Sequence, residues 1–181
     1  MTENIKTLAL KLRDRFDKHI SAGLLLLHYD RDYDRGLYVD RAGGPAGFSG
    51  LHVVAFLGIE EIMPAVLEME DWDINTYDCM GMTALTWASF RGCEEVVKKL
   101  LQRDDVNSDR ASNHGRTPLS WAAGQGNEGV EKMLLERDDV NPDLADKGGW
   151  TPLEWMAMKG HAGMVEMIKG REDVLAPYRI A

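Results

Sequence analysis

The chain of 181 residues repeats itself with a period of 34 residues. The segment TALTWAS at 83–89 returns as TPLSWAA at 117–123 and as TPLEWMA at 151–157. A weaker copy, SGLHVVA, lies 34 residues earlier, at 49–55. A fixed period of this length indicates stacked supersecondary units, in which each unit buries its apolar face against its neighbours.

Local signals place a helix pair in each unit. A turn of the form Asp-x-x-Gly-x-Thr comes first, as at 78–83 and 146–151, with Ser in place of Asp at 112–117. The Thr predicts a helix N-cap, and a Gly recurs where this first short helix should stop. A second helix should follow, with its inward residues at the same period. These are Ile62, Val96, Val130 and Met164, then Val66, Leu100, Leu134 and Ile168.

These residues resemble the ankyrin repeat, most closely at 117–141. The resemblance covers about 44–178 and implies an all-α solenoid of about four helix-turn-helix repeats. We expect repeats at approximately 44–77, 78–111, 112–145 and 146–178, within a repeat domain 44–181. The Trp-Ala-Ala and Arg-Asp-Asp-Val-Asn variants resemble ankyrin arrays of filamentous fungi, which often follow an NTPase module. Residues 1–47 contain no phosphate-loop motif.

One departure from the family concerns the motif histidine, which survives only at His52. Thr86, Ser120 and Glu154 replace it in the later copies. The hydrogen bonds that this histidine makes between neighbouring loops in the family must therefore be made by other groups, or lost.

Residues 1–43 precede the repeats. Apolar residues at helical spacing over 3–27 predict an amphipathic helical cap for the first repeat, with the tail of another domain as the alternative. Residues 29–41 alternate Asp, Arg and Tyr and are expected to form a charged, solvated loop. Asp30, Asp32 and Asp34 have the spacing of a calcium loop, but Arg35 and Arg41 occupy its required Gly and Glu positions.

Composition limits the classes of partner. A formal net charge of −9 disfavours nucleic acid and favours a protein partner with a neutral or basic surface. No apolar run is long enough to span a membrane, and the two cysteines suggest no disulfide framework. We expect a cytoplasmic, monomeric protein without a cofactor, metal site or catalytic residues.

The resemblance implies that a partner protein binds the concave groove and the turn tips. Three tryptophans at the repeat period were expected to lean toward this groove, either as partly exposed anchors or packed on one another to stiffen the array. Residues of the turn tips and of the inner-helix ends extend the same candidate surface. The complete set is Trp87, Trp121, Trp155, Phe90, Arg91, Met80, Met82, His114, Arg116, Trp150 and Met158.

A different class of function remains open at this stage. The chain could be a small enzyme or ligand-binding protein in which loop 29–41 packs against the first repeat. That alternative predicts a deep cavity lined by Tyr29, Asp32, Tyr38 and His52. A fragment without activity of its own is a third possibility.

Overall fold

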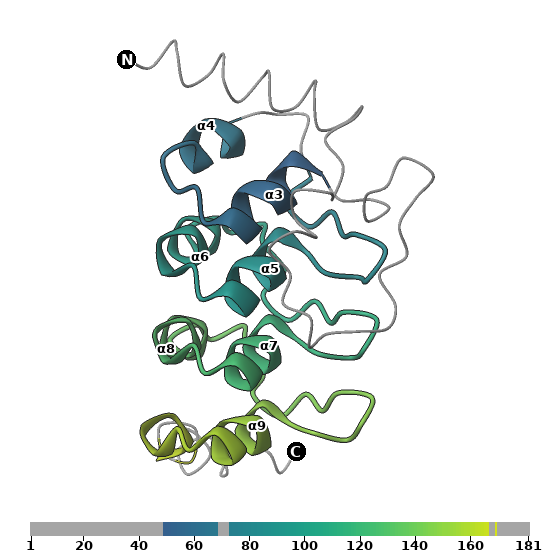
Figure 1. Cartoon of the computed structure of the whole chain (residues 1–181), viewed down its shortest axis with the longest axis vertical. Helices are drawn as coiled ribbons and strands as arrows, with labels where there is room; N and C mark the ends of the chain where they lie inside the picture. The colour runs from purple at the N-terminus through teal and green to yellow at the C-terminus, as the bar shows by residue number, and fades with distance from the viewer. Residues whose placement is uncertain (1–48, 69–72, 167–168, 170–181) are drawn as a thin grey trace.

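The computed structural model describes residues 49–68, 73–166 and 169. Within them, the helices form two stacked columns (Figure 1). The inner column consists of α3 (Gly50–Leu57), α5 (Ala84–Arg91), α7 (Pro118–Gln125) and α9 (Pro152–Lys159). The outer column consists of α4 (Met63–Leu67), α6 (Glu94–Leu101) and α8 (Glu128–Leu135), with further helical residues at 162–166. The predicted cap at 3–27 and the charged loop at 29–41 lie outside the described residues.

Each inner helix starts at the predicted hydroxyl cap. The side chains of Thr83, Thr117 and Thr151 accept a hydrogen bond from the backbone N–H three residues later. In α3 the cap is Ser49, whose backbone N–H donates to Nδ1 of His52 at 3.0 Å. These bonds satisfy backbone donors that the first turn of a helix leaves unpaired.

The same helices end at the periodic glycines. Gly58, Gly92, Gly126 and Gly160 have φ between 67° and 85°, and each backbone N–H returns to a carbonyl of the last turn. A residue with a Cβ rarely adopts this left-handed conformation, so glycine permits the chain to reverse here.

The columns pack through the expected periodic residues. Val96, Val130, Leu100 and Leu134 are at most 1% exposed. Neighbouring inner helices contact one another, as do neighbouring outer helices. The core therefore runs continuously along the stack, and no single repeat encloses it.

The turns between repeats are also bonded to one another. The backbone N–H of Asn113 donates to the Met80 carbonyl at 2.8 Å, and that of Lys147 donates to the His114 carbonyl at 2.9 Å. In the first repeat, Nε2 of His52 is 3.1 Å from the Met82 carbonyl. The family's histidine bond is thus present at His52, and bonds between turn tips connect the later turns.

Candidate functional site

The tryptophan column does not form the exposed patch that we considered. Trp87 and Trp121 are 3% and 1% exposed, and only Trp155 is half-buried. The expectation of partly exposed anchors is therefore wrong for the first two. The alternative, in which the tryptophans pack within the array, agrees with this burial, but Phe90 lies between Trp87 and Trp121.

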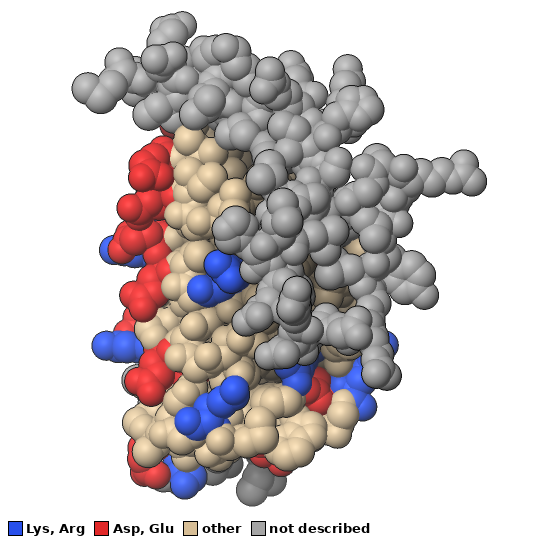
Figure 2. Space-filling view, viewed as in Figure 1, with Lys and Arg blue, Asp and Glu red and all other residues tan. Residues whose placement is uncertain are grey.

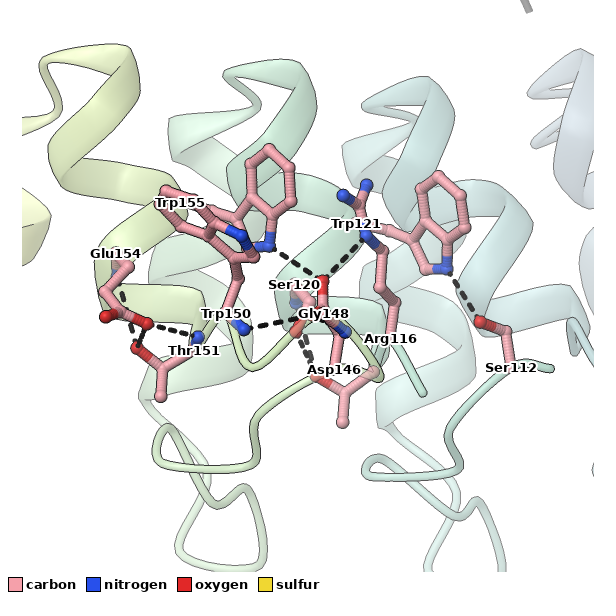
Figure 3. Close-up of polar contacts among 11 residues, drawn as sticks. Ser112, Arg116, Ser120, Trp121, Asp146, Gly148, Trp150, Thr151, Glu154 and Trp155 are labelled. Carbon is pink, nitrogen blue, oxygen red and sulfur yellow. Dashed lines mark hydrogen bonds and ion pairs between the residues drawn. The ribbon is translucent and has the colours of Figure 1, made fainter. Parts of the chain in front are cut away.

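Each indole N–H is tied to the turn of its own repeat. Trp87 Nε1 donates to Asp78 Oδ2 at 2.9 Å, and Trp155 Nε1 donates to Asp146 Oδ2 at 3.2 Å. Trp121 Nε1 donates to Ser112 Oγ at 3.3 Å (Figure 3). The donor and acceptor are nine residues apart in all three repeats. These bonds pair a polar atom that burial would otherwise leave unsatisfied, so the tryptophans are structural.

Phenylalanines complete this packing. The ring centroids of Phe56 and Trp87 are 5.2 Å apart, those of Trp87 and Phe90 are 5.9 Å apart, and those of Phe90 and Trp121 are 5.5 Å apart. All three pairs are edge-to-face, a favoured geometry for aromatic rings. Phe90, a predicted contact residue, is half-buried between two tryptophans and joins α5 to α7.

Arg116 is held between two repeats. Its guanidinium carbon lies 3.9 Å from the Trp155 ring centroid and 4.9 Å from that of Trp121. Its Nε donates to Asp146 Oδ2 at 3.2 Å (Figure 3). Arg116 was expected at a turn tip that contacts a partner, but it is largely occupied by contacts within the stack.

Asp146 is the polar centre of the last turn. Burial alone would raise the pKa of its carboxyl, but several hydrogen bonds hold this pKa below its ordinary value. The donors are the backbone N–H groups of Trp150 and Gly148, the Trp155 indole and Arg116. A carboxylate that accepts this many hydrogen bonds is stabilised in its ionised form.

The methionines of the first full turn point toward the core. Met82 is 1% exposed and Met80 is half-buried. The expectation of an exposed Met82 is wrong because its backbone N–H bonds to Asp78 Oδ1 at 2.9 Å and its side chain joins the core. The equivalent positions one and two repeats later are Arg116 and Trp150.

The remaining predicted residues are exposed and lie on one side of the stack. Met158 is 55% exposed and Trp150 is 44% exposed, and Arg91 and His114 are exposed as well. We define the inner surface as the exposed residues of the inner helices' C-terminal ends and of the turn tips. Its members are Leu57, Arg91, His114, Gln125, Lys147, Trp150, Met158 and Lys159.

Four of the inner-surface residues are exposed because they occupy the same position, the last residue of an inner helix, in successive repeats. Leu57, Arg91, Gln125 and Lys159 are the last residues of α3, α5, α7 and α9, and they are 34 residues apart. All four are exposed, with Leu57 at 53%. One structural position therefore presents four different side chains along the stack.

Charge is divided between the two sides of the stack. Asp and Glu gather along the edge that carries α4, α6 and α8, whereas Lys and Arg appear on the face of the inner helices (Figure 2). Among the residues of the inner helices, the charged ones are Arg91, Glu154 and Lys159. Glu154 accepts a hydrogen bond from the Thr151 N–H at 2.7 Å as part of a helix cap. Glu154 lies near the N-terminal end of α9 and is not part of the inner surface, whose charged members, Arg91, Lys147 and Lys159, are all positive.

Acidic residues that follow the outer helices form ion pairs with a neighbouring arginine. Arg103 makes two hydrogen bonds with Asp105, at 2.8 and 2.7 Å, and Arg137 makes two with Asp139, at 2.7 and 2.9 Å. Each arginine also donates to the carbonyl at the end of the preceding outer helix, Leu67 or Leu101. These arginines therefore connect successive repeats.

One buried pair had no signal in the sequence. Glu131 is 0% exposed, and its Oε1 lies 2.9 Å from Nδ1 of His161 in the next repeat. Burial raises the pKa of the Glu131 carboxyl, while His161 lowers it in part and the charge of Glu128 raises it further. Both residues fall at positions that the repeat pattern does not specify.

The alternative site combined loop 29–41 with His52 of the first repeat. Of these residues, only His52 is among those that the structure describes. This histidine is fully buried, with Nδ1 at the helix cap and Nε2 toward Met82. Among the described residues, no group of His, Cys, Asp or Glu could hold a metal ion. No helix within the described part of the chain is long and apolar enough to cross a membrane.

The helix pairs, inter-repeat turns and continuous core define a helical repeat solenoid. A family model for ankyrin repeats, with three copies, matches residues 17–110 and 104–175. The chain therefore belongs to the ankyrin repeat family, and the predicted all-α fold is confirmed. The first match begins within the segment assigned to the cap, so the boundary at residue 43 stays a prediction. No curated protein matches the chain.

Proposed function

We propose that this protein binds a partner protein through its inner surface, centred on the third and fourth repeats. Ankyrin repeats are generally protein–protein interaction modules. The observation that carries the proposal is the exposure of Trp150 and Met158, at 44% and 55%. Most of the aromatic residues nearby are buried in the core, whereas these Trp and Met side chains are exposed. Such side chains favour an adaptable apolar contact with a partner.

The inner surface is also rigidly supported. Trp150 lies against Trp155, with ring centroids 5.5 Å apart, and Trp155 is anchored by Asp146 and Arg116. A contact residue that is already ordered loses little side-chain entropy when a partner binds. The partner would therefore meet a preformed surface.

We retain a monomer in the cytoplasm as the expected state.

Site-specific photo-cross-linking in the native cell tests this proposal. A photo-reactive residue at Met158 or Arg91 should give a discrete adduct with one partner, which mass spectrometry can identify. The matched positions Lys98 and Lys132 are exposed on α6 and α8 and should give no such adduct. Equal adducts from both sets, or adducts from the outer helices alone, would exclude the inner surface as the binding site.

A further inference from the structure

We infer that the partner segment recognised by the inner surface is an extended acidic peptide that also carries a large apolar side chain. This inference rests on the proposed function and specifies the chemistry of the partner. Three features support it: cations of the inner surface without an acidic partner among the described residues, the spacing of these cations, and the exposed apolar residues beside one of them.

The inner surface presents cations that have no acidic partner within the described part of the chain. Arg91, Lys147 and Lys159 are exposed, and none of them forms an ion pair with a described residue. Arg91 lies over the Phe56 ring, with its guanidinium carbon 4.8 Å from the centroid, a contact that leaves its hydrogen-bond donors available. Carboxylates of a partner would satisfy these donors.

On the outer side, three of the cations have an acidic partner. Lys99, Arg103 and Arg137 lie within 4.0 Å of Glu60, Asp105 and Asp139, respectively. Acidic side chains nevertheless predominate along the edge that carries the outer helices (Figure 2). Many of them, such as Glu61, Asp104 and Asp138, lie in the segments that precede or follow these helices. A basic partner, which the net charge alone favoured, would therefore be attracted to the outer helices, whereas the inner surface is complementary to acids.

The spacing of the cations sets the spacing of the acids. Arg91 and Lys159 end α5 and α9, which are separated by α7 in the stack. Packed helices lie about 8–10 Å apart, so two intervals amount to about 16–20 Å. An extended chain advances about 3.3 Å per residue, so two acidic residues five or six positions apart would span this distance.

The exposed apolar residues indicate where the apolar side chain of the peptide binds. Trp150, Met158 and Lys159 all belong to the fourth repeat, and the first two are large and exposed. A bulky apolar side chain of the partner should therefore lie close to the acidic residue that meets Lys159. Gln125 is exposed on the helix between the two cations and can hydrogen-bond a polar group between the two acids.

Selection of peptides on the full chain tests the inference. A random twelve-residue phage library, panned on the immobilised protein, should yield peptides with two acidic residues five or six apart and a nearby Trp, Phe, Leu or Met. Affinities of a selected peptide are then measured by fluorescence anisotropy. The double variant Arg91→Glu/Lys159→Glu should weaken binding at least about tenfold, because like charges then face each other. A peptide with both acids changed to lysine should bind this variant better than it binds the wild type.

The matched control is Lys98→Glu/Lys132→Glu, which makes the same charge change on exposed residues of the outer helices. It should leave the affinity within about twofold of the wild type. A cation at a helix C-terminus also offsets the helix dipole, so thermal unfolding of each variant verifies that the fold is retained. Selected peptides that are basic, or that both double variants weaken equally, would overturn the inference.

The same experiment separates this inference from the proposed function. Peptides that lose binding with Trp150→Ala and Met158→Ala but show no charge preference would refute the acidic partner and leave the inner surface as the binding site. If no selected peptide depends on any inner-surface residue, both the inference and the proposed function fail.

Discussion

The indole N–H of Trp87 donates to the carboxylate of Asp78 at 2.9 Å and fixes α5 to the turn that precedes it. Trp87 is 3% exposed and Asp78 is also 3% exposed, so neither group has water as an alternative partner. Trp121 with Ser112 and Trp155 with Asp146 repeat this relationship. The periodic tryptophans thus secure the scaffold, and the binding that we propose is assigned to the residues exposed around them.

The first prediction concerns the structural role of Trp121. Trp121→Ala should lower the free energy of unfolding by about 3–5 kcal/mol. Trp121 is 1% exposed, so removal of its indole opens a cavity in the core. Trp150→Ala removes the same side chain from a position that is 44% exposed and should cost about 1 kcal/mol or less. Urea unfolding followed by circular dichroism measures both values. Equal costs would show that the buried column does not support the fold.

The second prediction isolates the indole hydrogen bond. Trp87→Phe retains an aromatic ring but leaves Asp78 Oδ2 without its indole donor, which should cost about 1–3 kcal/mol beyond the loss of ring volume. Trp121→Phe should cost less, because its acceptor is the neutral Ser112 hydroxyl at 3.3 Å. The same urea titrations compare the two variants. A larger cost for Trp121→Phe would contradict the assigned role of the Asp78 carboxylate.

The third prediction concerns the close approach of successive turns. Gly115 and Gly149 have similar φ values, 77° and 84°. A Cβ at Gly115 would lie 2.8 Å from the Lys147 backbone nitrogen, whereas one at Gly149 would meet nothing within 4 Å. Both alanine variants should lose about 1–2 kcal/mol to left-handed backbone strain, and Gly115→Ala should lose at least about 1 kcal/mol more to the clash.

The difference in unfolding free energy between these two variants measures the inter-repeat contact directly. Gly115→Ala should also accelerate amide hydrogen exchange at Lys147, whose N–H donates to the His114 carbonyl. Equal unfolding energies and unchanged exchange would mean that the turns do not pack as described.

The fourth prediction follows from the raised pKa of Glu131. Since the folded state holds this proton more tightly than the unfolded state, Glu131 stabilises the fold most at low pH. That contribution is lost as pH rises from the ordinary glutamate pKa, about 4.3, through the raised value. Glu131→Gln should therefore gain stability relative to the wild type as pH rises above the ordinary glutamate pKa.

Glu136→Gln is the matched control, because Glu136 is exposed at the C-terminal end of the same helix and is not among the charges that shift the pKa of Glu131. Its stability relative to the wild type should change little over this pH range. Chemical unfolding at several pH values gives both curves. Parallel curves for Glu131→Gln and the wild type would contradict the raised pKa.

Much of the scaffold could be predicted because its signals are local. The Thr caps, the glycine stops and the inward residues of the outer helices each depend on a few neighbouring residues at a fixed period. Such signals are readable in one repeat and are reinforced by the next. The family membership and the two-column fold followed from them.

The sequence left open whether Trp87 and Trp121 are exposed or packed, and it did not predict the burial of Met82, because these positions depend on contacts between repeats. Phe90 of one repeat inserts between tryptophans of two, an arrangement that no single repeat encodes. One usable signal was present: an Asp or Ser stands nine residues before Trp87, Trp121 and Trp155. The division of charge between inner and outer sides was likewise hidden by a single net charge.

Binding of the cross-linked partner to surface variants tests the central proposal most directly. The dissociation constant is measured for the wild type, for Trp150→Ala/Met158→Ala, and for the control Leu144→Ala. Leu144 is 37% exposed and lies outside the inner helices and the turn tips. We predict that the double variant weakens binding by at least about 100-fold, since contact residues of this kind each contribute about 2 kcal/mol or more. The control should bind like the wild type. Unchanged affinity of a folded Trp150→Ala/Met158→Ala variant would contradict the assignment of the inner surface as the binding site.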